Sequence, residues 1–97
     1  MILEIDFVPG LKVEISTESD IEYLQISGLC MHSSLVVTRI TEKVKDDEML
    51  ILVKLGLARK GYSGSFCYRV RLDENINIVK FGNEKAVIWT RDESVRF

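Results

Sequence analysis

Histidine is almost absent from this 97-residue chain, and its scarcity excludes several classes of enzyme. His32 is the single histidine, so a mechanism that needs two imidazoles, or a metal site built from several, has no residues to supply it. Cys30 lies two positions from His32, but no third group accompanies the pair to orient it, and we interpret the pair as incidental. We therefore expect a protein that is not an enzyme and that holds neither a metal nor another cofactor.

Cysteine, proline and long apolar runs are also sparse. Cys30 and Cys67 have no CxxC spacing, so we expect free thiols in a reducing cytosol, with a disulfide between them as the alternative. Pro9 is the only proline, which argues against a linker or tail. The longest apolar stretch, Met49 to Val53, is far shorter than the ~20 residues of a membrane-spanning helix. The amino terminus has no signal-peptide pattern, and we expect a cytoplasmic protein without membrane contact.

Alternating apolar and polar residues run through most of the chain and predict β-strands. Turn residues separate these segments at intervals of about 8–12 residues, a spacing typical of all-β sandwiches and barrels. We expect an antiparallel β-sandwich, or a barrel-like sandwich, of seven to eight strands that forms a single domain over residues 1–97. The expected strands cover residues 3–7, 11–16, 21–28, 34–41, 49–58, 65–72, 76–81 and 86–90.

Two hairpins and one loop are predicted between these strands. Pro9 and Gly10 suit a type II turn that joins the first two strands. The tight segment 61–64 suits a hairpin between the strands at 49–58 and 65–72. Residues 42–48 are expected to form a charged, flexible loop. In strand 65–72 the alternation predicts that Phe66, Tyr68, Val70 and Leu72 face one way and Ser65, Cys67, Arg69 and Arg71 the other.

Charge is unevenly distributed along the chain, although the formal net charge is only −2. Residues 1–48 carry ten acidic and four basic side chains, whereas residues 49–97 carry five acidic and nine basic ones. Such polarity in a chain without an evident catalytic set favours binding of a charged partner over transformation of a small-molecule substrate.

The acidic residues gather in two expected loops, 17–22 and 42–48. If these segments lie at one end of the sandwich, they form a patch that attracts a basic protein and occupies the cleft in which that protein holds RNA phosphates. An ordinary solvated surface is the alternative interpretation. The predicted partner-binding residues are Glu14, Glu18, Asp20, Glu22, Asp46, Asp47 and Glu48.

A second, basic face is predicted in segment 59–71, where cations and aromatic residues are mixed in the way that nucleic-acid binders use. The negative net charge of the chain makes nucleic acid the less favoured partner. A non-enzymatic assembly module, which would form a homo-oligomer, is a third alternative. The residues of the alternative basic face are Arg59, Lys60, Arg69 and Arg71.

Two segments of the carboxy-terminal half carry a family resemblance. They read Lys60-Gly61-Tyr62-Ser63-Gly64-Ser65-Phe66, followed by Tyr68-Arg69-Val70, and Phe81-Gly82-Asn83-Glu84-Lys85, followed by Ile88-Trp89-Thr90-Arg91. Over residues 59–91 the chain resembles the immunity proteins of bacterial contact-dependent growth inhibition systems. The resemblance implies a cytoplasmic antitoxin that binds a cognate toxin domain, often a nuclease, and blocks its active-site groove. It assigns no toxin-facing residue, so the acidic contact set rests on charge clustering alone.

Overall fold

Seven β-strands and one turn of 3-10 helix make up the computed structural model, which describes residues 1–30, 34–58 and 60–91. The all-β fold is therefore confirmed. No helix in these three ranges is long and apolar enough to cross a membrane. The elements are η1 (Ile5–Phe7), β1 (Lys12–Glu18), β2 (Ile21–Leu29), β3 (Leu35–Lys45), β4 (Glu48–Leu57), β5 (Ser65–Arg71), β6 (Ile78–Phe81) and β7 (Ala86–Thr90).

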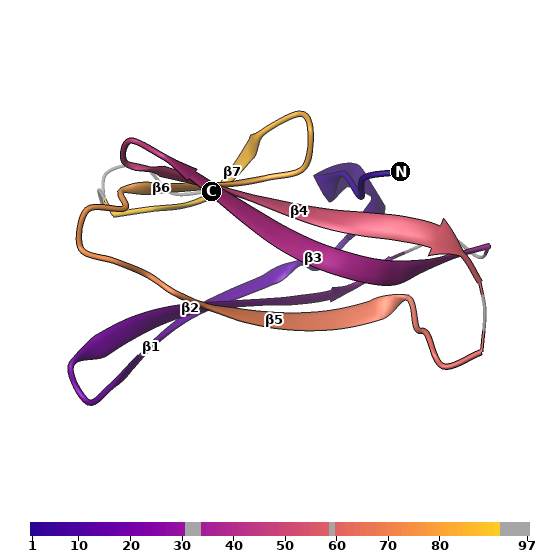
Figure 1. Ribbon diagram of the computed structural model, residues 1–97, viewed down its shortest axis with the longest axis horizontal. Coiled ribbons are helices and arrows are strands. Elements are labelled where there is room, and N and C mark those ends of the chain that lie inside the picture. The colour runs from indigo at the N-terminus through magenta and orange to yellow at the C-terminus, as the bar shows by residue number, and fades with distance from the viewer. Residues whose placement is uncertain (31–33, 59, 92–97) are drawn as a thin grey trace.

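The strands form two sheets that face each other as a sandwich (Figure 1). The three-stranded sheet, here called the lower sheet, has the order β1-β2-β5, and the four-stranded upper sheet has the order β3-β4-β6-β7. Adjacent strands are antiparallel except β4 and β6, which are parallel. This exception arises because β5, which lies between β4 and β6 in the sequence, belongs to the lower sheet. The chain therefore returns to the upper sheet before β6 begins.

The core lies between the sheets because each strand turns one apolar face inward. In β4 the inward residues Met49, Ile51 and Val53 are at most 3% exposed, and Leu24 of β2 is fully buried. Phe81 is also fully buried, in the same core cluster. Burying one large apolar side chain contributes about 1.5–3 kcal/mol, so this layer supplies most of the stability. The alternating facing predicted for segment 65–72 is confirmed over β5, whose side chains alternate between exposed and inward.

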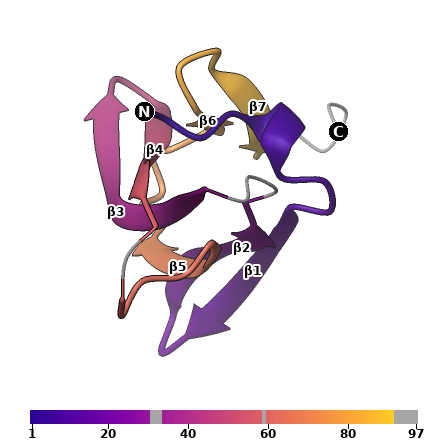
Figure 2. The same cartoon turned by 90° about the vertical axis from the view of Figure 1, so that its right-hand side faces the viewer.

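The predicted first strand is wrong. Residues Ile5–Phe7 form η1, and only Ile2 makes a β-bridge, to Lys54. After this short contact with β4 the segment passes beside β7 down to β1, as Figure 2 shows, and so closes one side of the sandwich. Leu3 and Val8 enter the core at 1% and 2% exposure.

Both predicted hairpins are wrong as well. β1 pairs with β2 through the turn at Ser19 and Asp20, which both have positive φ, and not with the segment before Pro9. β4 ends in the upper sheet, whereas β5 lies in the lower sheet and pairs with β2. The expected loop at 42–48 is instead the end of β3, a tight turn at Asp46 and the start of β4.

The two cysteines differ in their exposure to solvent. Cys30 is buried, Cys67 is exposed, and both are free thiols, as expected.

The Tyr68 hydroxyl on β5 donates a hydrogen bond of 3.1 Å to Oε2 of Glu42 on β3, which links the two sheets. Burial, followed by the charge and the hydrogen bond of Glu42, raises the pKa of the Tyr68 phenol above 10.0.

Replacing Glu4 by alanine is expected to lower the free energy of unfolding by about 1–2 kcal/mol. Its carboxylate accepts hydrogen bonds of 3.0 and 3.1 Å from the backbone N–H groups of Asn83 and Glu84, and so fastens the amino-terminal segment to the β6–β7 turn. Urea unfolding of Glu4→Ala against Asp6→Ala, an exposed acid of the same segment, measures the difference. Equal stability of the two variants would contradict this role for Glu4.

Stability is expected to fall above pH 10 in part through Tyr68. Because its pKa is higher in the folded state, the folded state holds the phenol proton more tightly, so this contribution is complete below pH 10.0 and is lost as the pH rises through the raised value. Tyr68→Phe should therefore show a shallower decline in the free energy of unfolding over that range. Guanidinium unfolding at a series of alkaline pH values tests this, and identical slopes in both proteins would exclude it.

Candidate binding groove at the acidic end

One end of the sandwich carries both the β1–β2 turn and the β3–β4 turn. The loop 72–77 lies between them (Figure 1) and is hydrogen-bonded to both regions. Leu72 N–H donates to the carbonyl oxygen of Glu22 over 2.8 Å, and Asn77 N–H donates to the carbonyl oxygen of Asp47 over 2.8 Å. The Asn77 side chain adds a bond of 3.2 Å to the Asp47 carboxylate. The acidic segments thus do lie at one end, here called the acidic end.

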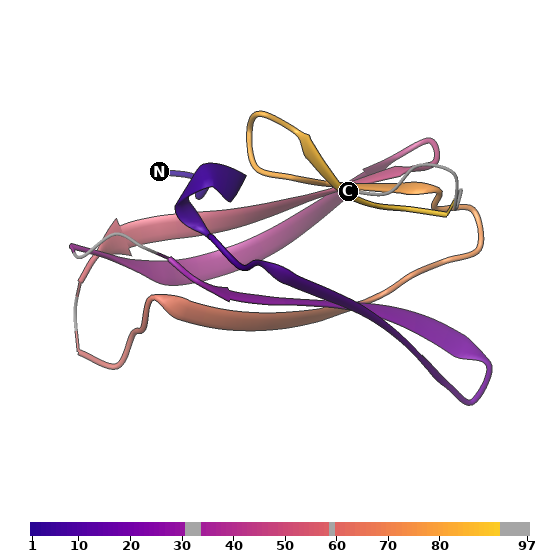
Figure 3. The same ribbon diagram turned by 180° about the vertical axis from the view of Figure 1, so that it is seen from behind.

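A groove of about 690 Å³ opens at this end between the β1–β2 turn and the loop 72–77. Figure 3 shows that the β1–β2 hairpin projects beyond the rest of the molecule, which leaves one wall of the groove standing free. The groove is lined by Thr17, Asp20, Ile21, Glu22, Arg71, Leu72, Asp73, Glu74, Asn75 and Arg91.

Six of the seven predicted acids lie at the acidic end, but only two of them line the groove. These two are Asp20 and Glu22. Glu18 and Glu48 belong to this end but are held in ion pairs, with Arg69 at 2.8 Å and with Lys80 at 2.9 Å. Glu14 lies in the middle of β1, where it pairs with Lys12 at 3.0 Å, so the structure separates it from the others. Asp46 and Asp47 occupy the neighbouring β3–β4 turn.

The groove keeps an acidic excess after its ion pairs are counted. Arg91 pairs with Glu22 at 3.1 Å, and Arg71 pairs with Asp73 at 3.2 Å. Asp20 and Glu74 are exposed and have no ion-pair partner within the ranges 1–30, 34–58 and 60–91. A cationic side chain entering the groove therefore meets two carboxylates that are free to bind it.

Arg91 lines the groove and connects the elements that form it. Its Nε and Nη2 atoms donate to the carbonyl oxygen of Ile76 over 3.1 and 2.9 Å, and Nη2 also donates to the carbonyl oxygen of Asp73 over 3.2 Å. Its Nη1 atom donates to Glu22 of β2, and its guanidinium lies 5.2 Å from the ring centroid of Trp89. One planar cation thus joins the end of β7, the loop 72–77 and β2, a geometry that suits arginine and not lysine.

Sequence reasoning missed Asp73, Glu74 and Arg91. They belong to the basic half of the chain, and the predicted acidic patch included only residues of the acidic half. The available signal was the Asp73-Glu74 pair, which directly follows an amphipathic strand and thus lies in a turn at a strand end. Its approach to the β1–β2 turn depends on the pairing of β2 with β5, which sequence spacing does not reveal.

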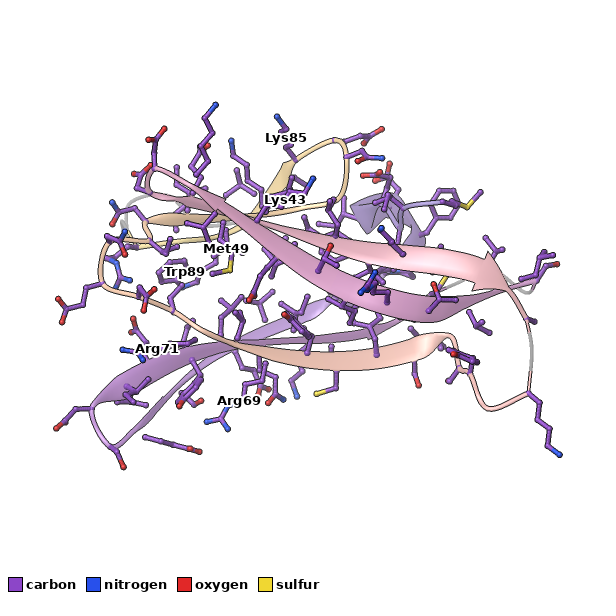
Figure 4. The ribbon with its side chains drawn as sticks, viewed as in Figure 1. Lys43, Met49, Arg69, Arg71, Lys85 and Trp89 are labelled. Carbon is purple, nitrogen blue, oxygen red and sulfur yellow. The ribbon has the colours of Figure 1, made fainter. Side chains whose placement is uncertain are left out.

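The alternative basic face is divided in the structure. Arg59 lies outside the described residues, and Lys60 lies in the segment that crosses between the sheets. Arg69 and Arg71 lie near the opposite end of β5 (Figure 4). Each is already paired with a carboxylate, Arg69 with Glu18 and Arg71 with Asp73. Arg69 also lies 3.9 Å from the ring centroid of Tyr23, and its hydrogen bond to Glu18 is the main cause of a raised pKa.

Comparison of the chain with protein-family models, with curated proteins and with solved structures returned no match. The resemblance to immunity proteins therefore stays a prediction. Within the described parts of the chain, no group of three or more histidine, cysteine, aspartate or glutamate side chains is arranged to hold a metal ion.

Arg91→Lys is expected to loosen the loop 72–77 because lysine cannot replace the forked contacts of the guanidinium. We expect a loss of about 1–3 kcal/mol in the free energy of unfolding and faster amide hydrogen exchange at Ile76 and Asn77. Arg71→Lys, which alters one exposed ion pair of the same groove, serves as the control and should change stability by less than about 0.5 kcal/mol. Equal exchange rates in the two variants would refute the anchoring role of Arg91.

Proposed function

We propose that the protein is a binding module that holds a basic protein partner in the acidic groove, in the manner of an immunity protein that neutralises a nuclease toxin. The observation that carries the proposal is the groove itself, a concave site with two exposed carboxylates, Asp20 and Glu74, on opposite walls. Neither has an ion-pair partner among the described residues. A nuclease presents cations where it binds phosphate, so an acidic groove matches the surface that must be blocked.

Electrostatic steering is the first part of the proposed mechanism. The acidic end gathers carboxylates from the β1–β2 turn, the β3–β4 turn and the loop 72–77 on one side of the molecule. Oriented charge of this kind accelerates encounter with an oppositely charged surface, and the effect weakens as salt screens it.

Steric occlusion is the second part. The projecting β1–β2 hairpin is a two-stranded ribbon whose turn residues, Ser19 and Asp20, stand at its tip. A ribbon of this kind can enter the substrate groove of a toxin while the loop 72–77 contacts the rim. The partner needs no chemical change, in keeping with a protein for which we expect no catalytic role.

Neutralising the two free carboxylates is expected to slow association with the toxin. In Asp20→Asn with Glu74→Gln, we expect the association rate constant for the toxin domain encoded beside this gene to fall about threefold to tenfold at low ionic strength. The difference from the unmodified protein should shrink as salt is raised. Asparagine suits Asp20 because it tolerates the positive φ of 67° at this position.

The matched control is Asp6→Asn with Glu14→Gln, which removes the same number of charges from exposed sites away from the groove. Biosensor kinetics at several salt concentrations compare the two double variants. Equal slowing in both would assign the effect to net charge and reject the groove. If no neighbouring reading frame encodes a toxin domain that this protein binds and inhibits, the immunity function itself is rejected.

A further inference from the structure

We propose that the outer face of the upper sheet is a separate binding site for the phosphate backbone of nucleic acid. The face lies away from the acidic groove, and the inference does not depend on the function proposed for that groove. It is here called the basic sheet face, and its cations are Arg39, Lys43, Lys45, Lys54, Lys80 and Lys85.

Strand register places these cations on one side. In β4 the core residues Met49, Ile51 and Val53 point inward, so the intervening side chains point outward. Residues directly opposite in neighbouring strands share a face. Lys43 lies opposite Leu50, Arg39 lies opposite Lys54, and Leu50 in turn lies opposite Lys80 of β6. Figure 4 shows Lys43 and Lys85 on the outer side of the upper sheet, with Met49 and Trp89 on its inner side.

Most of these cations are not neutralised. Lys80 pairs with Glu48 at 2.9 Å. The other five have no ion pair with any residue of the three described ranges. On the outer face of the lower sheet the opposite holds, since Lys12, Arg69 and Arg71 are all paired with carboxylates. In a chain with 15 acids and 13 bases, composition alone does not explain a face of unpaired cations.

The chemistry of the face suits a chain of phosphates that is bound without base recognition. Five of its six cations are lysines, which contact phosphate as flexible point charges and do not impose a bidentate geometry. Among the apolar residues of this face Leu52 is only 8% exposed, whereas Val87, opposite Lys80, is 38% exposed. The outward side chains of β3, β4 and β6 include no aromatic ring on which bases can stack, so binding independent of sequence is expected.

The test measures binding of a fluorescent DNA duplex and a single-stranded RNA, each of mixed sequence and about 20 nucleotides per strand, at about 50 mM salt. In Lys43→Gln, Lys45→Gln, Lys54→Gln, we expect affinity to fall about tenfold or more. We also expect the slope of log affinity against log salt to fall by about 2–3, since each lost phosphate contact removes about 0.7–0.9. All three side chains are exposed, and thermal melting checks that the variant remains folded.

The matched control is Lys60→Gln, Arg69→Gln, Arg71→Gln, which removes the same charge from the alternative basic face. A loss of less than about threefold in this control supports the basic sheet face. Equal losses in both triple variants would overturn the proposal, as would the absence of binding to both nucleic acids.

Polyglutamate and vesicles of phosphatidylserine are the competing probes. Binding of either one in preference to nucleic acid, with the same loss in the first variant, would assign the face to an acidic protein or to a membrane and reject nucleic acid.

Discussion

Burial of one face of each sheet against the other is the constraint on which the rest of the structure depends. Alternate residues of every strand must be apolar to fill the layer around Ile51 and Phe81, so the charged residues are left to the two outer faces and the turns. No charged or polar side chain in the described ranges is buried. Where each charge lies is thus decided by strand facing and topology, and position along the chain is a poor guide to it.

Topology creates the acidic groove. Because β5 joins β2 in the lower sheet and β6 joins β4 in the upper one, the loop 72–77 must span the end of the sandwich. There it meets the β1–β2 turn and accepts three hydrogen bonds from the Arg91 side chain, whose fourth goes to Glu22 of β2. A simple meander of hairpins would place Asp73 and Glu74 in an ordinary exposed turn, without an opposing wall.

Local pattern predicted the elements better than their partners. Period-two alternation located β2 and the facing of β5, the β-branched residues of segment 34–41 located the start of β3, and the nearly continuous apolar run at 49–58 located β4. All three signals depend on neighbouring residues alone. Pairing depended on turns, and here Pro9 and Gly10 misled because Ser19 and Asp20 adopt positive φ without glycine. The proposed acids were found in part for the same reason. Asp20 and Glu22 lie beside a turn visible in the sequence, whereas Asp73, Glu74 and Arg91 reach the groove through distant pairings.

A count of charge over the two halves of the chain also could not predict the basic sheet face, because its cations come from both halves. Arg39, Lys43 and Lys45 belong to the acidic half, but the strand register directs them to the outer side of β3, where Lys45 lies opposite Glu48 beside the β3–β4 turn. Folding does not require this arrangement. Two like charges about 7 Å apart in water repel by only about 0.6 kcal/mol, and salt reduces this further. A repulsion this small allows cations to remain unpaired on one face but does not require it. Acidic residues placed as they are on the lower sheet would pair with these cations. The difference between the two outer faces is the observation on which the proposed binding of nucleic acid rests.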